Sequence, residues 1–158
     1  MARFIIALGS SHELGQKYLT KAVKKIHENS LIMVCGGAKI YKNSSSLTGY
    51  NCLFYNSALA IKSRMHPFLL YRELYALEHY LGRIRTHQNS RRTIDLDMLI
   101  SLDFCYNSNV FFLPHKQAFK RIFFVIPMIE ALKSAGWHVP IEVLKARSQG
   151  GQAIMQQV

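Results

Sequence analysis

Two aspartates, Asp95 and Asp97, lie in the segment RRTIDLDMLI of a chain that contains few acidic residues. They alternate with Ile94, Leu96 and Met98, and this period of two is typical of a β-strand with one apolar face. Residues two apart on a strand project from the same face, so both carboxylates can converge on cations. Oxygen ligands with room for water suit Mg²⁺, and a pair of such ions is a recurrent phosphoryl-transfer site. The alternative is an edge strand whose acidic face lies in solvent.

Arginines precede the same segment, since Arg83, Arg85, Arg91 and Arg92 lie within ten residues of the chain. Guanidinium groups pair bidentately with phosphate oxygens, so a loop of arginines beside bound Mg²⁺ can hold a polyphosphate. A solvated basic loop is the other interpretation. The sequence has neither the glycine-rich phosphate loop nor the dinucleotide-binding motif, so a phosphate cradle of that kind is excluded.

Composition limits the class of protein. The chain has 158 residues, which suits one domain, and 20 Lys and Arg against 9 Asp and Glu give it a net charge of +11. Such a charge indicates a polyanionic partner: nucleotide phosphate, nucleic acid or an acidic membrane surface. Cys35, Cys52 and Cys105 form no metal-binding pattern, so we expect reduced thiols in a cytoplasmic protein. No apolar run has the length of a membrane span.

Periodicity predicts the elements that must position these residues. Strands are expected at residues 3–9, within 31–41, at 51–61, over the two aspartates and at 110–114. Helices are expected at 13–28, at 67–82 and from about 117 to 134, the last kinked or restarted at Pro127. This order favours an α+β sandwich in which helices cover a mainly antiparallel sheet. Residues 1–147 are expected to form the domain, and residues 148–158 a flexible tail.

A resemblance to a known family runs from about residue 2 to residue 144. RRTIDLDMLI followed by LPHKQAFKRIF resembles the signature region of 6-hydroxymethyl-7,8-dihydropterin pyrophosphokinase (2-amino-4-hydroxy-6-hydroxymethyldihydropteridine diphosphokinase), where R-T-x-D-L-D precedes P-H and R-x-F. The segments FIIALGSS and NSALAI are similar to other parts of that family. The resemblance implies a ferredoxin-like fold and an enzyme of folate biosynthesis. The reaction would transfer pyrophosphate from ATP to the pterin hydroxymethyl group and release AMP.

The resemblance also implies a role for individual residues. Asp95 and Asp97 would hold two Mg²⁺, and Arg83 and Arg92 would act on the triphosphate during the reaction. We expect a monomer whose partners are the small-molecule substrates ATP and hydroxymethyldihydropterin, without a membrane or a nucleic acid. The residues implied for ATP are Glu78, Arg85, Arg92, His115 and Arg121, and those implied for the pterin are Phe54, Asn56 and Phe123.

Several positions depart from the family pattern. Ser90-Arg91 replaces a Gly-Pro, Asn43-Ser44-Ser45 replaces Thr-Pro-Pro, Ser11 replaces the Asn of a G-S-N turn, and Tyr75 replaces a Gln. These changes leave open a divergent member with weak or no transferase activity. A basic RNA-binding module is a further alternative that fits the net charge of +11. The sequence lacks the RNA-recognition signature, however, and in such a module the two aspartates would repel the phosphate backbone of the RNA.

Overall fold

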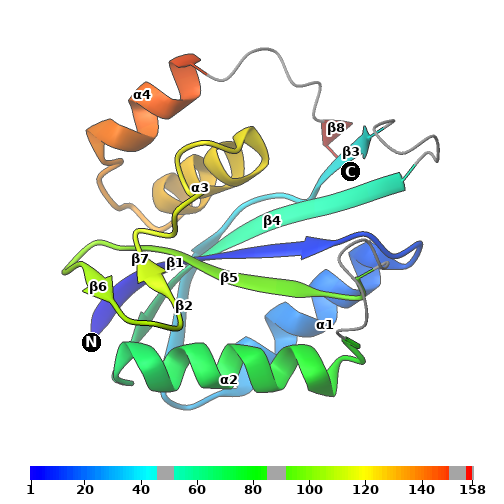
Figure 1. The fold of residues 1–158 in the computed structure, drawn as a ribbon, viewed down its shortest axis with the longest axis horizontal. Coiled ribbons are helices and arrows are strands. Elements are labelled where there is room, and N and C mark those ends of the chain that lie inside the picture. Colours follow the sequence, from blue (N-terminus) through cyan, green and yellow to red (C-terminus); the bar gives the residue numbers. More distant parts are fainter. Residues whose placement is uncertain (46–51, 85–91, 150–155, 158) are drawn as a thin grey trace.

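One antiparallel sheet with helices on both faces forms the core of the protein (Figure 1). The computed structural model describes residues 1–45, 52–84, 92–149, 156 and 157. The order of elements confirms the predicted ferredoxin-like α+β sandwich. In chain order they are β1 (Ala2–Ser10), α1 (Gly15–Glu28), β2 (Ile32–Gly37), β3 (Tyr41–Ser45), β4 (Cys52–Ser63), α2 (Pro67–Tyr80), β5 (Asp95–Ser101), β6 (Tyr106–Asn107), β7 (Phe112–Leu113), α3 (Ile122–Ser134), α4 (Ile141–Gln149) and β8 (Gln156–Gln157).

The sheet has the strand order β5-β1-β4-β3-β8, and every pairing in it is antiparallel. The long strand β4 pairs with β2 over its second half and with β3 over its first half. Strand β5, which carries the two aspartates, pairs with β1 and ends the path at one edge. Strands β6 and β7 form a separate two-stranded sheet.

The first face of the sheet is covered by α1 and α2. Alternate residues of β1, namely Phe4, Ile6 and Leu8, are buried there. Apolar side chains at helical spacing meet them from the two helices, and burial of each leucine or isoleucine side chain stabilises the fold by about 1.5 to 3 kcal/mol. The helix residues in this cluster are Leu19, Ala22, Ile26, Leu70 and Leu74.

The second face is covered by α3, which packs on Ile5, Ala7 and Leu99 among others. The predicted start of this helix at Gln117 is wrong. Ala118 N donates to His115 O at 2.8 Å and Lys120 N to Gln117 O at 3.1 Å, so this segment forms tight turns. The helix begins at Ile122 and continues through Pro127 to Ser134 without a restart.

Two features near the C-terminus were not predicted. Helix α4 was missed because its sequence has weak apolar periodicity, although Val143 is fully buried. Gln156 and Gln157 pair with Lys42 and Tyr41 of β3. The proposed boundary between domain and tail stays a prediction, since residues 150–155 and 158 lie outside the described residues. Among the described helices, none is both long and apolar enough to cross a lipid bilayer.

Candidate functional site

Strand register places the two aspartates on the edge strand β5, beside β1. Asp95 pairs with Gly9 of β1, and Asp97 pairs with Ala7. Leu96 and Met98 are buried in the cluster under α1 and α2, so both aspartates point to the opposite face, as their alternation predicted. Both are half-buried instead of lying fully in solvent. The site therefore lies on the α3 side of the sheet, at the start of β5.

Glu78 brings a third carboxylate to the same place from the end of α2. It is 2% exposed, and its Oε1 accepts a hydrogen bond from Leu96 N at 2.7 Å. The same oxygen accepts from Arg83, whose Nη1 also lies 2.5 Å from Asp95 Oδ1. We call Glu78, Asp95 and Asp97 the acidic cluster. Its members belong to α2 and β5, so helix-to-strand packing is needed to assemble it.

Of the arginines that the structure describes, Arg83 and Arg92 contact this cluster, and they do so in different ways. The Arg83 side chain is 10% exposed and bridges two carboxylates. Burial alone would lower the pKa of Arg83, but Asp95 and Glu78 outweigh it and raise that pKa. The Arg92 side chain is 48% exposed and donates from Nη1 to Asp95 Oδ2 at 2.6 Å. Arg83 is thus fixed in place, whereas Arg92 can exchange its partner at low cost.

Asp97 is the carboxylate of the cluster that neither of these arginines contacts, although both oppose the rise of its pKa. Among the described residues it makes no hydrogen bond or ion pair. Burial, followed by repulsion from Asp95 and Glu78, raises its pKa to about 7. An unpaired carboxylate in such surroundings gains from a nearby cation. Within the described part of the chain no three His, Cys, Asp or Glu side chains form a ready metal cage, so two carboxylates would need further ligands from water and phosphate, as Mg²⁺ commonly does.

His115 and Arg121 flank the acidic cluster from the segment before α3. His115 N donates to Leu99 O at 2.7 Å, which ties this segment to β5. Burial and the nearby Arg121 lower the pKa of His115, although Asp95 opposes the shift. Its Nδ1 accepts from Gln117 N at 3.2 Å, so the neutral ring carries its proton on Nε2. Arg121 is exposed, with its guanidinium 5.5 Å from the centre of the Phe123 ring.

The residues expected to bind the pterin lie on the same side of the sheet. Phe54 and Asn56 alternate along β4, and Phe123 belongs to the helix that covers this face. Asn56 is 8% exposed and pairs with Gly9, which pairs in turn with Asp95. A Cβ on Gly9 would lie 3.6 Å from Asn56 Oδ1 and 3.8 Å from Asp95 Cβ. Because glycine has no side chain, the surface between the Asn56 amide and the Asp95 carboxylate stays open, and we call it the Gly9 floor.

Sequence reasoning missed one partner in this part of the site. Asn56 Nδ2 donates to Asn43 Oδ1 at 2.8 Å, a contact between neighbouring strands β4 and β3. Asn43 had been noted only as a departure from the family pattern, and no local motif signals the contact. Arg85, expected at the nucleotide, and Arg91 lie outside the described residues, so the structure does not place them.

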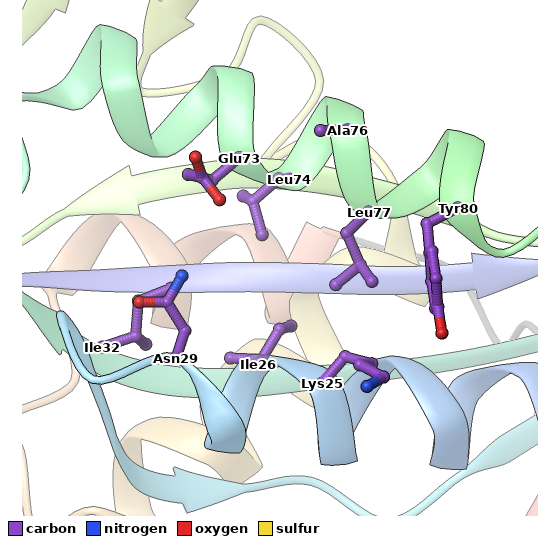
Figure 2. Close-up of a pocket in the computed structure, with 9 residues that line it drawn as sticks. All are labelled: Lys25, Ile26, Asn29, Ile32, Glu73, Leu74, Ala76, Leu77 and Tyr80. Atoms are coloured by element: carbon purple, nitrogen blue, oxygen red, sulfur yellow. The ribbon is translucent and has the colours of Figure 1, made fainter.

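A cavity of about 320 Å³ lies elsewhere, between α1 and α2 on the first face of the sheet (Figure 2). Figure 2 shows Ile26 and Lys25 of α1 facing Leu74, Leu77 and Tyr80 of α2. None of the residues expected to bind substrate or metal lines it. Its walls are largely aliphatic, and it offers no cluster of charges for a polyphosphate. We therefore locate the candidate site by its charges and not by this cavity.

Comparison with known proteins identifies similarity along most of the chain. The family model for 7,8-dihydro-6-hydroxymethylpterin-pyrophosphokinase (HPPK) matches residues 5–133. The chain is 32% identical over 127 residues to the 2-amino-4-hydroxy-6-hydroxymethyldihydropteridine pyrophosphokinase of Bacillus subtilis, covering 79% of this chain and 75% of that protein. It is 27% identical over 125 residues to the protein of the same name from Haemophilus influenzae, covering 79% and 78%.

Solved structures share the fold. A crystal structure of an HPPK-DHPS in complex with substrates superimposes with a TM-score of 0.68 at 7% identity, covering 94% of this chain. The Plasmodium falciparum HPPK-DHPS with SDX-DHP gives a TM-score of 0.65 at 10% identity, again over 94% of this chain. The chain spans 45% and 43% of these two longer proteins, so the similarity concerns one part of each.

Proposed function

The chain belongs to the 7,8-dihydro-6-hydroxymethylpterin-pyrophosphokinase family, and we propose that its acidic cluster is the place where ATP is cleaved. The protein is an ATP-dependent pyrophosphokinase of folate biosynthesis, which transfers pyrophosphate to 6-hydroxymethyl-7,8-dihydropterin and leaves AMP. The family match favours this function over the RNA-binding alternative. What remains to be proposed is which residues act and how.

The observation that carries the proposal is the unpaired carboxylate of Asp97. Among the described residues, Glu78 and Asp95 contact Arg83 or Arg92, whereas Asp97 has no hydrogen-bond or ion-pair partner. A purely structural role would be expected to pair such a buried charge. An unpaired carboxylate is what a site for Mg²⁺ and a nucleotide triphosphate requires, because the cations arrive with the substrate.

We assign two Mg²⁺ to Asp95 and Asp97. Their carboxylates point to one face of β5, and oxygen donors are the ligands that Mg²⁺ prefers. Bound there, Mg²⁺ would neutralise the phosphate oxygens while the pyrophosphoryl group is transferred. Asp95 Oδ2 becomes available when the exposed Arg92 leaves it for a phosphate.

The arginines divide the work on the triphosphate. Arg83 stays between Glu78 and Asp95 and presents its remaining N–H groups at a fixed position. Arg92 is half-exposed and turns toward the phosphates as charge develops on them. Glu78 acts by holding Arg83 and the backbone of β5, although the family resemblance associates it with ATP. This chemistry depends on positioning and charge and needs no side-chain nucleophile.

His115, Arg121 and Arg85 complete the nucleotide site. His115 is neutral near pH 7 and offers Nε2–H as a hydrogen-bond donor to a phosphate oxygen. Arg121 is an exposed cation beside it and supplies charge for the same phosphates. Arg85 is assigned by resemblance alone.

The pterin lies over the Gly9 floor and next to Asn56. Phe54 and Phe123 provide apolar ring surfaces on this side of the sheet, which suit a flat heterocycle. The buried Asn56 amide provides hydrogen bonds for the polar edge of the ring. Because Gly9 separates Asn56 from Asp95, the hydroxymethyl group can lie near the phosphates.

An assay of AMP release tests the proposed function. Purified protein with ATP, Mg²⁺ and 6-hydroxymethyl-7,8-dihydropterin should produce AMP and the pterin diphosphate in equal amounts. Omission of either Mg²⁺ or the pterin should stop AMP production. The Asn56→Ala variant should need more pterin for the same rate, with little change in the ATP requirement. Slow or absent turnover by the wild-type protein would support the divergent, inactive alternative.

A cytoplasmic location and a monomeric state are further parts of the proposal. Cys35 and Cys105 carry free thiols, which fits a reducing compartment. Light scattering coupled to size-exclusion chromatography should give a mass near 18.1 kDa, and a mass of twice that value would contradict the monomer.

A further inference from the structure

Ser10 and Ser11, at the end of strand β1, form hydrogen bonds with the backbone of Arg92. Ser11 Oγ accepts a hydrogen bond from Arg92 N at 2.8 Å, and Ser11 N donates to Arg92 O at 3.0 Å. Ser10 Oγ also donates to Arg92 O, at 3.1 Å, and accepts from His12 N at 3.2 Å. Both backbone polar groups of Arg92 are therefore held by two consecutive serines, which we call the serine clasp.

The clasp lies directly beyond the regular ladder between β1 and β5. The last ladder pair is Gly9 with Asp95, and the serines contact the chain three residues before Asp95. Ser10 is 4% exposed, one of few polar side chains buried in the described part of the chain. A hydroxyl buried at this depth needs hydrogen-bond partners, and Ser10 Oγ has Arg92 O as its acceptor and His12 N as a donor.

The clasp fixes the backbone of an arginine whose side chain is half-exposed. The Arg92 side chain is 48% exposed and contacts Asp95 through a hydrogen bond from Nη1 to Oδ2. A long side chain with a fixed Cα can reach only a limited volume, so its guanidinium stays near the acidic cluster. If the Cα were loose, more side-chain entropy would be lost whenever Arg92 met a phosphate.

We propose that Ser11 is a positioning residue for pyrophosphoryl transfer, acting through the backbone of Arg92. The proposal rests on the assignment of Arg92 to the triphosphate given above. Ser11 needs no contact with either substrate in this role. Loss of its hydroxyl removes the acceptor for Arg92 N, while Ser10 still holds Arg92 O. The expected defect is therefore a slower transfer step and not a weaker pterin site.

Ser63 provides a matched control at the far end of β4. Its Oγ donates to Leu31 O at 3.2 Å and accepts from Met65 N at 3.1 Å, so it also joins a strand end to neighbouring backbone. It is 1% exposed and contributes nothing to the acidic cluster. Ser63→Ala should lower the melting temperature at least as much as Ser11→Ala, yet leave kcat unchanged.

A double-mutant cycle with Arg92 tests the proposal. In the wild-type background, Ser11→Ala should lower kcat by about 10- to 100-fold with little change in the KM for pterin, the scale of a misplaced reacting group. In the Arg92→Ala background, the same change should alter kcat by less than about twofold, because the residue through which Ser11 acts is gone. Ser11→Thr keeps the hydroxyl and should retain most of the rate.

Each outcome of the cycle has one meaning. An equal loss of kcat from Ser11→Ala in both backgrounds would overturn the proposal, since Ser11 would then act independently of Arg92. A loss of melting temperature without a loss of kcat would also overturn it and leave a structural clasp. If Arg92→Ala alone left the rate unchanged, the assignment of Arg92 to the triphosphate would be wrong. That result differs from the two outcomes that overturn the role of Ser11.

Discussion

Strand β5 has an aspartate near each end, Asp97 near its start and Asp103 just after its last residue, and the two carboxylates have different surroundings. Beyond its last residue, Asp103 receives Arg3 Nη2 at 2.5 Å and Arg3 N at 2.6 Å. One carboxylate there meets one guanidinium and one backbone donor, mostly in solvent, and the hydrogen bonds from Arg3 lower the pKa of Asp103. At the other end, Asp97 has no described partner, and burial with neighbouring carboxylates raises its pKa to about 7.

The comparison separates a structural acid from a functional one. Both aspartates lie close to arginines, so proximity to opposite charge does not distinguish them. The difference is the pairing of each carboxylate: Asp103 forms an ion pair with Arg3, whereas Asp97 has no ion-pair partner among the described residues and leaves an excess of negative charge there. A fold tolerates such an excess at a cost in stability, and the excess is useful where a cation must bind.

Replacing the unpaired acid should have the largest effect. Asp97→Asn keeps the size of the side chain but removes the charge, so AMP release should fall by roughly 1,000-fold or more, the upper range for a single charge-stabilising group. The measurement is steady-state AMP production with saturating ATP, Mg²⁺ and pterin. Asp103→Asn is the matched control and should keep the wild-type rate. Similar rates for the two variants would contradict the assignment of Asp97 to function and of Asp103 to structure.

Loss of Arg92 should lower activity far more than loss of Arg3, the arginine at the other end of β5. Arg92→Ala should lower kcat by about 100-fold or more while the KM for pterin changes little, because the guanidinium acts on charge in the transition state. Arg3→Ala removes the partner of Asp103 and should leave kcat unchanged. Full kinetic curves for both substrates give this comparison. A large rise in the pterin KM with unchanged kcat would instead assign Arg92 to substrate binding.

Stability should respond in the opposite sense to activity. The pKa of Asp97 is raised from 3.8 to about 7, so ionising it in the folded protein costs stability as pH rises through that window. Asp97→Asn should therefore raise the metal-free free energy of unfolding at pH 8 by about 1 to 2 kcal/mol, well below the full shift because the group is partly solvated. The gain should shrink as pH falls from 7 toward 4.

Denaturant unfolding of both proteins at pH 5 and pH 8, without Mg²⁺, measures this difference. The predicted signature is a variant that is more stable yet inactive. Should Asp97→Asn be less stable than the wild type at pH 8, the carboxylate would have an unrecognised partner, and the claim of unbalanced charge would be wrong.

The smallest effect should come from the balanced end. Because the pKa of Asp103 is lowered from 3.8, its ion pair stabilises the fold above that pH and loses the contribution as pH falls below it. Asp103→Asn should reduce the melting temperature only slightly at pH 7 and not at all near pH 2, since exposed pairs contribute little. Thermal melts at these two values check the sign, and a large change at pH 7 would show that this pair is structurally important.

Local patterns predicted the parts of the site that depend on one segment. Alternation was enough to place Asp95 and Asp97 on one face of a strand, and to put Leu96 on the other. Contacts between distant segments were beyond this reasoning. Ser11 meets Arg92 across 81 positions of sequence, and Asn43 meets Asn56 only because of the register between β3 and β4.

The errors in the fold have a similar origin. The apolar residues after Gln117 looked helical by type, but His115 draws the backbone into turns before the helix can begin. Arg121 is extended and separates those turns from α3. Glu78 was assigned to the nucleotide site by the family resemblance, but its burial and its hydrogen bond from Leu96 N depend on how α2 packs against β5. The sequence alone could not predict that packing.

Calorimetric titration of a non-hydrolysable ATP analogue, with and without Mg²⁺, examines the role of the unpaired carboxylate most directly. For the wild type and for Asp103→Asn, Mg²⁺ should tighten binding by at least about tenfold, equivalent to 1.4 kcal/mol. For Asp97→Asn, most of that gain should disappear while metal-free binding persists. An undiminished Mg²⁺-dependent gain in Asp97→Asn would contradict the assignment of the metal site to the acidic cluster.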